Sequence, residues 1–152
     1  MKYYNIINHT YISFFGIGYI PIASGTFGSL AGLLLGYIIN QINFNLFYLL
    51  IPIMLLMGII GSNLYEEQSG VKDSKIIVID EVVGQLISMM FFMQNNILIV
   101  LSFFIFRLFD ICKPWPASYI DKKIKGGMGV MLDDVVAGIY TAITLYIINI
   151  YI

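Results

Sequence analysis

The chain has 152 residues, a length that fits one domain, so we treat 1–152 as a single membrane-embedded domain. Its composition is 59% hydrophobic and only 11% charged, whereas soluble domains carry about 25% charged residues. This deficit excludes an ordinary soluble protein. The formal net charge of -1 offers nothing to a nucleic-acid partner. The single cysteine, Cys112, excludes an intrachain disulfide and a cysteine-cluster metal site.

Long stretches without Lys, Arg, Asp or Glu indicate where the chain enters the bilayer. These stretches are 3–65, 82–106 and 135–152. We therefore predict an all-α integral membrane bundle of about five hydrophobic helices, roughly 28–40, 46–65, 82–94, 96–112 and 134–152. Segment 82–94 would cover only about 20 Å, so we expect it either to extend back through Asp80 and Glu81 or to enter the membrane partly. No apolar block with a cleavage site follows the N-terminus, so we expect no removed signal peptide.

The topology follows from the turns between these helices. Segments 40–43 and 94–96 are short, polar and uncharged, so each should join two antiparallel neighbours. Counting the crossings then places the charged blocks 66–81 and 107–134 on one side of the membrane, together with segment 16–29. Six lysines fall on that side: Lys72, Lys75, Lys113, Lys122, Lys123 and Lys125. The positive-inside rule predicts that this side is cytoplasmic.

Three glycines repeat every four residues along the first predicted helix: Gly28, Gly32 and Gly36. Small residues at this spacing let a second helix backbone approach closely. Packing within the chain is the first interpretation of this pattern. The alternative is a homodimer that forms through the same three glycines.

Five acidic residues lie at the predicted cytoplasmic ends of the helices: Asp80, Glu81, Asp110, Asp133 and Asp134. Acidic residues also favour helix N-termini through the helix dipole, which is the alternative explanation for each pair taken alone. Carboxylates at membrane depth are costly and are usually functional or paired. Several of them at one place repel each other unless a cation binds between them. Oxygen ligands without His or Cys suit Mg²⁺.

Two basic residues could bind a phosphate beside these acids. Arg107, Asp110 and Lys113 are spaced i, i+3 and i+6, which places them near one another on one side of a helix. Arg107 could instead serve only as a structural ion pair with Asp110. Thr26 lies in a Gly-Thr-Phe-Gly-Ser segment that opens the first predicted helix, where free N–H groups can bind an anion or where the residues simply cap the helix.

Other hydrolytic chemistries lack the residues that they require. The chain has one histidine, His9, which leaves no set of zinc ligands and no histidine nucleophile in a suitable context. Ser118 stands where a Cys-x5-Arg phosphatase loop would place arginine relative to Cys112. We therefore expect Cys112 to be an inert thiol.

Together with segment 16–29, three strongly matching stretches resemble the phosphatidylglycerophosphatase A family. They are Val-Ile-Asp-Glu at 78–81, Phe-Arg-Leu-Phe-Asp-Ile-Cys-Lys-Pro-Trp-Pro at 106–116, and Gly-Gly-Met-Gly-Val-Met-Leu-Asp-Asp-Val-Val-Ala-Gly at 126–138. The resemblance extends from about Gly16 to Gly138. The chain departs from the family pattern at Ser24, where the pattern has proline before Gly25 and Thr26.

The resemblance implies a Mg²⁺-dependent, multi-pass enzyme of the bacterial inner membrane. Such an enzyme removes the terminal phosphate of phosphatidylglycerophosphate to give phosphatidylglycerol, and its soluble relatives are all-helical. We expect the phospholipid substrate to keep its acyl chains in the bilayer and to present its phosphate at the cytoplasmic face.

We assign roles on this basis. Metal ligands are expected among Asp80, Glu81, Asp133 and Asp134. These four and Asp110 form the expected catalytic group. Arg107, Lys113 and Thr26 are expected to bind the substrate phosphate. The nucleophile stays open between water and an aspartate.

Two further functions compete with this assignment. One is a phosphatidyl transferase acting on CDP-linked lipid, which also uses clustered acids and Mg²⁺, although the Asp-Gly…Ala-Arg…Gly…Asp…Asp spacing expected there is missing. The other is a non-catalytic membrane subunit or carrier, which would need no metal.

Overall fold

The computed structural model describes residues 2–72 and 74–151, and within these ranges it contains helices and no strand. Its elements are α1 (Lys2–Ile12), η1 (Ile17–Tyr19), α2 (Ser24–Ile42), α3 (Phe44–Ser69), α4 (Ile79–Met89), α5 (Asn96–Cys112), α6 (Ala117–Lys123) and α7 (Gly127–Tyr151). The predicted all-α class is confirmed.

The five predicted hydrophobic helices correspond to α2, α3, α4, α5 and α7, with bounds that differ at most ends. The α5 bounds agree with the prediction. Helix α4 begins at Ile79, which confirms the expected extension through Asp80 and Glu81, but it ends at Met89 rather than at 94. Helix α7 begins at Gly127, well before 134, so both of its aspartates lie inside the helix. The short helices α1 and α6 were not predicted, because neither contains a long apolar run.

Three described helices are long and apolar enough to cross a membrane, namely α2, α3 and α7. The molecule is therefore a membrane protein. Helix α4 has 11 residues, which at ~1.5 Å per residue gives roughly 16 Å, too short for the ~30 Å hydrocarbon core. Helix α4 is thus too short to cross the hydrocarbon core by itself, and the prediction that it enters the bilayer only partly agrees with its length.

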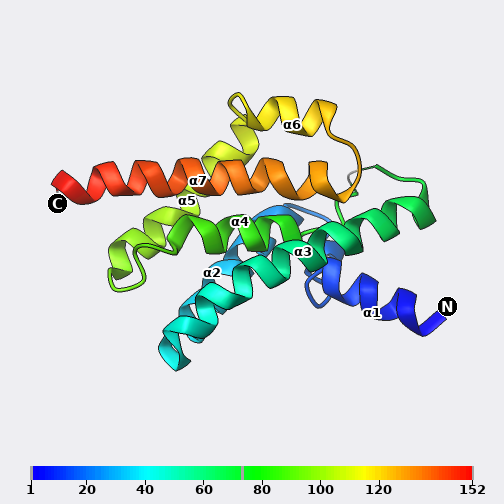
Figure 1. The fold of residues 1–152 in the computed structure, drawn as a ribbon, viewed down its shortest axis with the longest axis horizontal. Helices are drawn as coiled ribbons and strands as arrows, with labels where there is room; N and C mark the ends of the chain where they lie inside the picture. The colour runs from blue at the N-terminus through cyan, green and yellow to red at the C-terminus, as the bar shows by residue number, and fades with distance from the viewer. Residues whose placement is uncertain (1, 73, 152) are drawn as a thin grey trace.

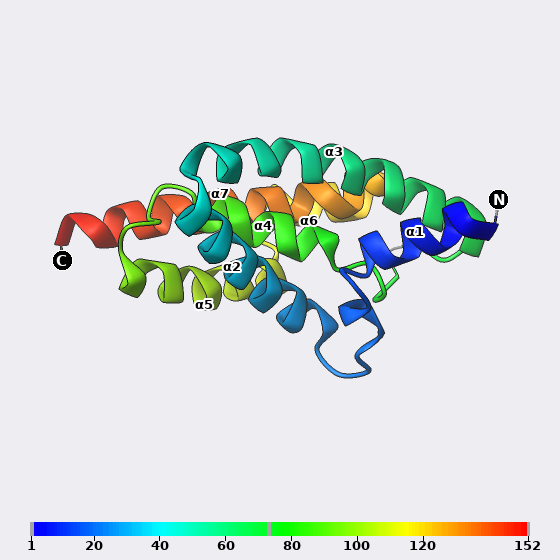
Figure 2. The ribbon, with the colours of Figure 1, turned by 90° about the horizontal axis from the view of Figure 1, so that it is seen from below.

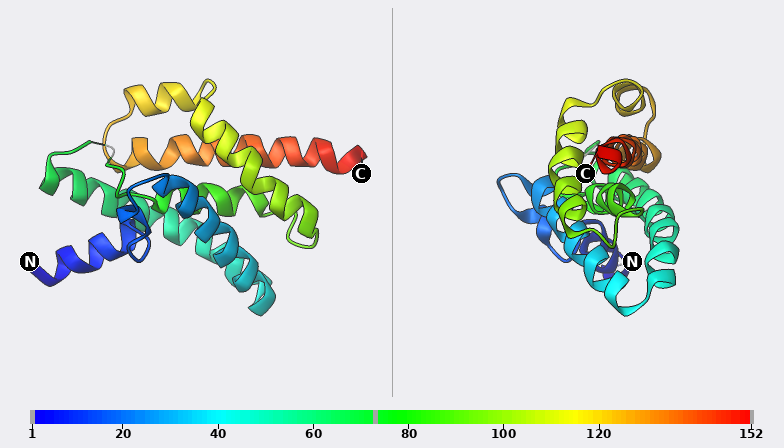
Figure 3. Two further views of the ribbon diagram at one scale, coloured as in Figure 1. Left: turned by 180° about the vertical axis from the view of Figure 1, so that it is seen from behind. Right: turned by 90° about the vertical axis from the view of Figure 1, so that its left-hand side faces the viewer.

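Helix α4 forms the centre of the bundle. Seen end-on in the right-hand view of Figure 3, it is surrounded by α2, α3, α5 and α7. Nine of its residues are buried: Ile79, Asp80, Val82, Val83, Gly84, Gln85, Leu86, Ser88 and Met89. The other helices thus cover a short central helix whose first turn carries acidic residues.

The glycine stripe of α2 packs against this central helix. A Cβ atom at Gly32 would lie 2.8 Å from the carbonyl oxygen of Val82, and one at Gly36 would lie 2.8 Å from the Leu86 side chain. Gly28 likewise faces Val78. These three glycines therefore serve helix packing within the chain, because residues at and before α4 cover the face that they form.

The two ends of the bundle differ in chemistry. The C-terminus lies at the same end as the α2–α3 and α4–α5 turns, whereas the α3–α4 loop lies toward the other end (Figures 1 and 2). Asparagines cap the helices at the two short turns: Asn43 Oδ1 accepts from the Leu46 amide at 3.1 Å, and Asn95 Oδ1 accepts from the Ile97 amide at 3.0 Å. Turns of this kind satisfy the free N–H groups of a helix start without any charged residue.

Candidate active site

Three carboxylates meet where the first turn of α4 approaches α7. Asp80, Glu81 and Asp134 each offer an oxygen, and these oxygens lie within 4.8 Å of one another. Asp80 is 8% exposed and Asp134 is 3% exposed. We call these three residues the carboxylate triad.

Two glycines allow the close approach that forms the triad. A Cβ atom at Gly138 of α7 would lie 2.6 Å from the carbonyl oxygen of Gly84, and one at Gly84 would lie 2.8 Å from the carbonyl oxygen of Asp134. Any side chain at either position would push the two helices apart. The backbone contact between α4 and α7 therefore fixes where Asp134 lies relative to Asp80 and Glu81.

The triad has the donors that a hard cation requires. Asp80 Oδ1, Glu81 Oε2 and Asp134 Oδ2 are buried and have no hydrogen-bond partner among the described residues. Buried polar atoms are nearly always satisfied in native proteins, and buried carboxylates without partners are costly. Three carboxylates this close together, each with a buried oxygen that lacks a partner among the described residues, fit Mg²⁺, which takes oxygen ligands.

Arg107 of α5 lies beside the triad and is largely buried. Its guanidinium forms an ion pair with Asp110, in which the two side chains are 17% and 12% exposed. Nη1 also donates to the Ser29 hydroxyl at 3.3 Å. Nε is buried without a partner among the described residues. Arg107 is therefore oriented by two groups and still has donor capacity for a ligand.

Gly25 brings the start of α2 against these groups. A Cβ atom at Gly25 would collide with the Glu81 carboxylate and would lie 3.2 Å from Arg107 Nη1. The Thr26 amide donates to the Ala23 carbonyl at 2.9 Å, which uses one of the N–H groups proposed for an anion. Within the part of the chain that the structure describes, no hydrogen bond or ion pair joins Thr26 to the triad, so its phosphate role stays a prediction. The preceding residue, Gly25, lies against Glu81 and Arg107.

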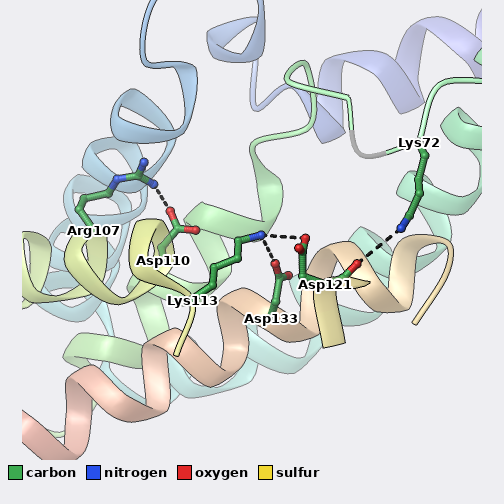
Figure 4. Close-up of polar contacts among 6 residues, drawn as sticks. All are labelled: Lys72, Arg107, Asp110, Lys113, Asp121 and Asp133. Carbon is green, nitrogen blue, oxygen red and sulfur yellow. Dashed lines mark hydrogen bonds and ion pairs between the residues drawn. The ribbon is translucent and has the colours of Figure 1, made fainter. Parts of the chain in front are cut away.

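Lys113 does not join Arg107 as its helical spacing predicted. It follows the last residue of α5 and has a left-handed backbone with φ of 41°. Its ammonium donates to Asp133 Oδ2 at 2.5 Å and to Asp121 Oδ1 at 3.0 Å, and Figure 4 shows it pointing toward these two acids. The prediction from helical spacing does not hold for Lys113, because α5 ends at Cys112.

Two ion pairs determine the charge state of Lys113. Burial alone would lower the pKa of its ammonium, but hydrogen bonds and charges from Asp133 and then Asp121 outweigh burial and raise the pKa above its usual range. Asp133 thus lies beside the triad with its carboxylate bonded to Lys113. Its role as a metal ligand stays a prediction.

A cavity of about 440 Å³ opens next to Glu81 and Arg107. Its wall includes residues of segment 18–25 and Lys75. Neither Lys75 nor Ser29 was assigned to the site from sequence. Ser29 could have been found, because it is the polar residue on the glycine face of α2; Lys75 lies in a loop with no periodic signal.

Comparisons with known proteins identify the family to which the chain belongs. A family model described as Phosphatidylglycerophosphatase A matches residues 10–149. The chain is 37% identical to phosphatidylglycerophosphatase A of Escherichia coli K12, over 89% of this chain and 79% of that protein. It is 38% identical to the protein of that name in Haemophilus influenzae, over 89% and 84%.

A third relative carries a different name. It is a protein of Bacteroides thetaiotaomicron, provisionally named as a phosphatidylinositol-3-phosphatase, with 34% identity over 86% of each chain. No solved structure matches the chain significantly. The family model covers nearly the whole sequence and both bacterial relatives of the same name match along most of their length. The chain therefore belongs to the phosphatidylglycerophosphatase A family.

Proposed function

We propose that this protein is a Mg²⁺-dependent lipid phosphatase. It removes the terminal phosphate of phosphatidylglycerophosphate and leaves phosphatidylglycerol, at the cytoplasmic face of a bacterial inner membrane. Membership of the family supports the reaction. The carboxylate triad, with three buried oxygens that lack partners among the described residues, is the observation that carries the metal dependence.

In this proposal, one group of residues binds the metal and another binds the phosphate. Asp80, Glu81 and Asp134 would hold Mg²⁺, which supplies positive charge to the phosphoryl group when bound. The remaining donors of Arg107 would bind phosphate oxygens, since a guanidinium matches a phosphate with two parallel hydrogen bonds. Asp110 and Ser29 hold Arg107 in place. Phosphoryl transfer depends mainly on such positioning and charge stabilisation.

The reaction itself is the hydrolysis of a phosphate monoester. A nucleophile attacks phosphorus, the bond from phosphorus to the glycerol oxygen breaks, and the alcohol leaves with a proton. A carboxylate that accepts the proton of the nucleophile must lie within hydrogen-bond reach of it, and Asp110 and Asp133, beside the triad, are the candidates for this role.

The position of the site suits a substrate anchored in lipid. The triad lies at the start of α4 and near the start of α7, toward the end of the bundle that carries the α3–α4 loop. The acyl chains can remain in the bilayer while the phosphate reaches the carboxylates. The lysines at this end support a cytoplasmic orientation through the positive-inside rule.

Phosphate release by the purified full-length protein tests the proposal. Dioleoyl phosphatidylglycerophosphate in mixed micelles should lose phosphate with Mg²⁺ present and should not do so in EDTA. Phosphatidylinositol 3-phosphate serves as the competing substrate suggested by the Bacteroides relative. Release of CMP from a CDP-linked lipid would support a phosphatidyl transferase instead. Activity that is unchanged in EDTA after metal removal would contradict the assigned metal site.

A further inference from the structure

The cavity beside Arg107 extends past the group that would bind the reacting phosphate. It has a volume of about 440 Å³, within the usual range for pockets that bind small molecules. Glu81 and Arg107 form one part of its wall, and Lys75 with Ile76 forms another. The cavity thus has a cation on two separate chain segments.

The first turn of α2 holds these two segments together. The Ser24 hydroxyl donates to the Lys75 carbonyl at 3.0 Å, while the neighbouring Gly25 lies against Glu81 and Arg107. Two consecutive residues, whose Cα atoms are about 3.8 Å apart, therefore contact the Lys75 backbone and the Arg107 guanidinium. Lys75 and Arg107 both line one small cavity, on two sides of this turn.

The Lys75 side chain is available to a ligand. It is exposed, and among the residues that the structure describes its ammonium makes no hydrogen bond or ion pair. Tyr19 at the end of η1, which also lines the cavity, and Ile22, between the lining residues Pro21 and Ala23, are 56% and 78% exposed. Exposed apolar side chains beside a lysine are typical of a surface that meets lipid headgroups.

We infer that Lys75 binds the second phosphate of the substrate, the phosphodiester that joins the glycerol headgroup to the diacylglycerol. This inference rests on the proposed function, in which Arg107 and the triad take the terminal phosphate. The substrate then differs from a lipid with a single phosphate, such as phosphatidic acid, by the additional negative charge of this phosphodiester. The ammonium of Lys75 binds this phosphodiester. Lys75 therefore contributes to substrate specificity and takes no part in bond breaking.

The variant Lys75→Gln tests this role, with Lys72→Gln as the matched control. Both lysines are exposed and lie in the same loop, but Lys72 donates to the backbone carbonyl of Asp121, away from Arg107 (Figure 4). We expect Lys75→Gln to lower kcat/KM on phosphatidylglycerophosphate about tenfold, through KM with kcat unchanged, because this contact is the same in ground and transition states. Lys72→Gln should change kcat/KM less than twofold, and Lys75→Arg should retain most activity.

A soluble pair of competitors supplies a second measurement. Glycerol 1,3-bisphosphate carries both phosphates and glycerol 1-phosphate carries one. The wild-type protein should be inhibited more strongly by the bisphosphate, and Lys75→Gln should lose this preference while keeping its inhibition by the monophosphate.

The outcomes separate this inference from the proposed function. Equal losses in Lys72→Gln and Lys75→Gln would reveal general attraction to an anionic surface and would overturn the inference. A wild-type kcat/KM in folded Lys75→Gln, or a loss confined to kcat, would also overturn it. A wild-type protein that does not hydrolyse phosphatidylglycerophosphate with Mg²⁺ would instead overturn the proposed function.

Discussion

The ammonium of Lys113 lies 2.5 Å from the carboxylate of Asp133. This contact links the residue that follows α5 to the first part of α7, one residue before the triad member Asp134. The Asp133 side chain is 5% exposed and that of Lys113 is 30% exposed, so the pair is mostly shielded from water. The geometry favours a structural role for Lys113 over the phosphate-binding role expected from its spacing.

Replacing Lys113 by methionine should therefore lower stability more than substrate binding. Removing one partner of a buried pair costs about 3–5 kcal/mol, and the partial exposure of Lys113 reduces this to roughly 1–3 kcal/mol. Thermal unfolding in detergent should show a lower Tm by several degrees. Because the pKa of Lys113 is raised, its ammonium stays charged through neutral pH, and the difference should be the same at pH 6 and pH 8.

The control is Lys122→Met, which removes an exposed charge from the neighbouring α6. Its Tm should match the wild type within about a degree, since surface substitutions cost little. A normal Tm with a raised KM in Lys113→Met would restore Lys113 to the phosphate-binding group.

The triad gives a prediction that does not depend on activity alone. A ligand that binds only the folded state raises Tm by mass action, so Mg²⁺ should stabilise the wild-type protein against heating. Asp134→Asn keeps the shape of the side chain but removes its charge, and it should abolish this Mg²⁺-dependent increase. Its activity should fall at least about 100-fold, roughly 2.7 kcal/mol of barrier.

Asp121→Asn is the matched control for this change. Asp121 is also an acid at the end of the bundle that we expect to be cytoplasmic, and it pairs with Lys113 outside the triad. The increase in Tm with Mg²⁺ should persist in Asp121→Asn. Partial recovery of Asp134→Asn at high Mg²⁺ would mark a weakened ligand, whereas an unchanged response to Mg²⁺ would remove Asp134 from the metal site.

The fold class and the three acids of the triad could both be predicted from the sequence, each for a different physical reason. Charge-free runs of apolar residues predict helices in lipid directly. Asp80, Glu81 and Asp134 stand out because ionisable residues are rare in such a chain. The glycine spacing of α2 predicted close helix packing, and Gly32 lies against the α4 backbone.

Other features depend on where helices end and on contacts between distant segments. Lys113 leaves the Arg107 face because α5 has ended at Cys112. The ion pair between Lys113 and Asp121 of α6 could not be predicted either. Helix α6 is short and lacks the periodic apolar pattern by which a helix is recognised in a sequence. The hydrogen bond from Ser24 to Lys75 joins positions 51 residues apart, and no local pattern predicts such a contact.

The topology can be checked by cysteine labelling, and the structure improves the choice of sites. Cys112 is exposed and must first become serine. Cysteine at Lys72 or Lys123 should react only with a reagent that crosses the membrane, because both lie on the expected cytoplasmic side. For the outer turn, Gln94 is the better site, since Asn95 caps α5 through two backbone amides and its loss would weaken the helix.

Under the predicted topology, cysteines at positions 72 and 123 must show the same labelling, and a cysteine at position 94 must differ from them. Reaction of all three cysteines with an impermeant reagent added outside intact cells would contradict the predicted orientation. Reaction of 72 and 123 alone would show that the orientation is inverted.

The final prediction concerns Arg107, which either serves only Asp110 or also binds the substrate phosphate. Arg107→Lys keeps the positive charge and can still pair with Asp110, but it loses the planar guanidinium and its spare Nε donor. If the ion pair were the whole role, this change would leave kcat/KM nearly intact. We expect kcat/KM to fall more than tenfold while the Tm changes by only a few degrees.

The double variant Arg107→Lys with Asp110→Asn distinguishes a shared role from two separate ones. If Asp110 acts by holding Arg107, the loss in the double variant should be smaller than the product of the single losses. Ser29→Ala removes the second group that orients the guanidinium and should produce a milder loss of the same kind. Full activity in folded Arg107→Lys would show that the pair with Asp110 is a structural contact between two turns of α5, and that the phosphate is bound elsewhere.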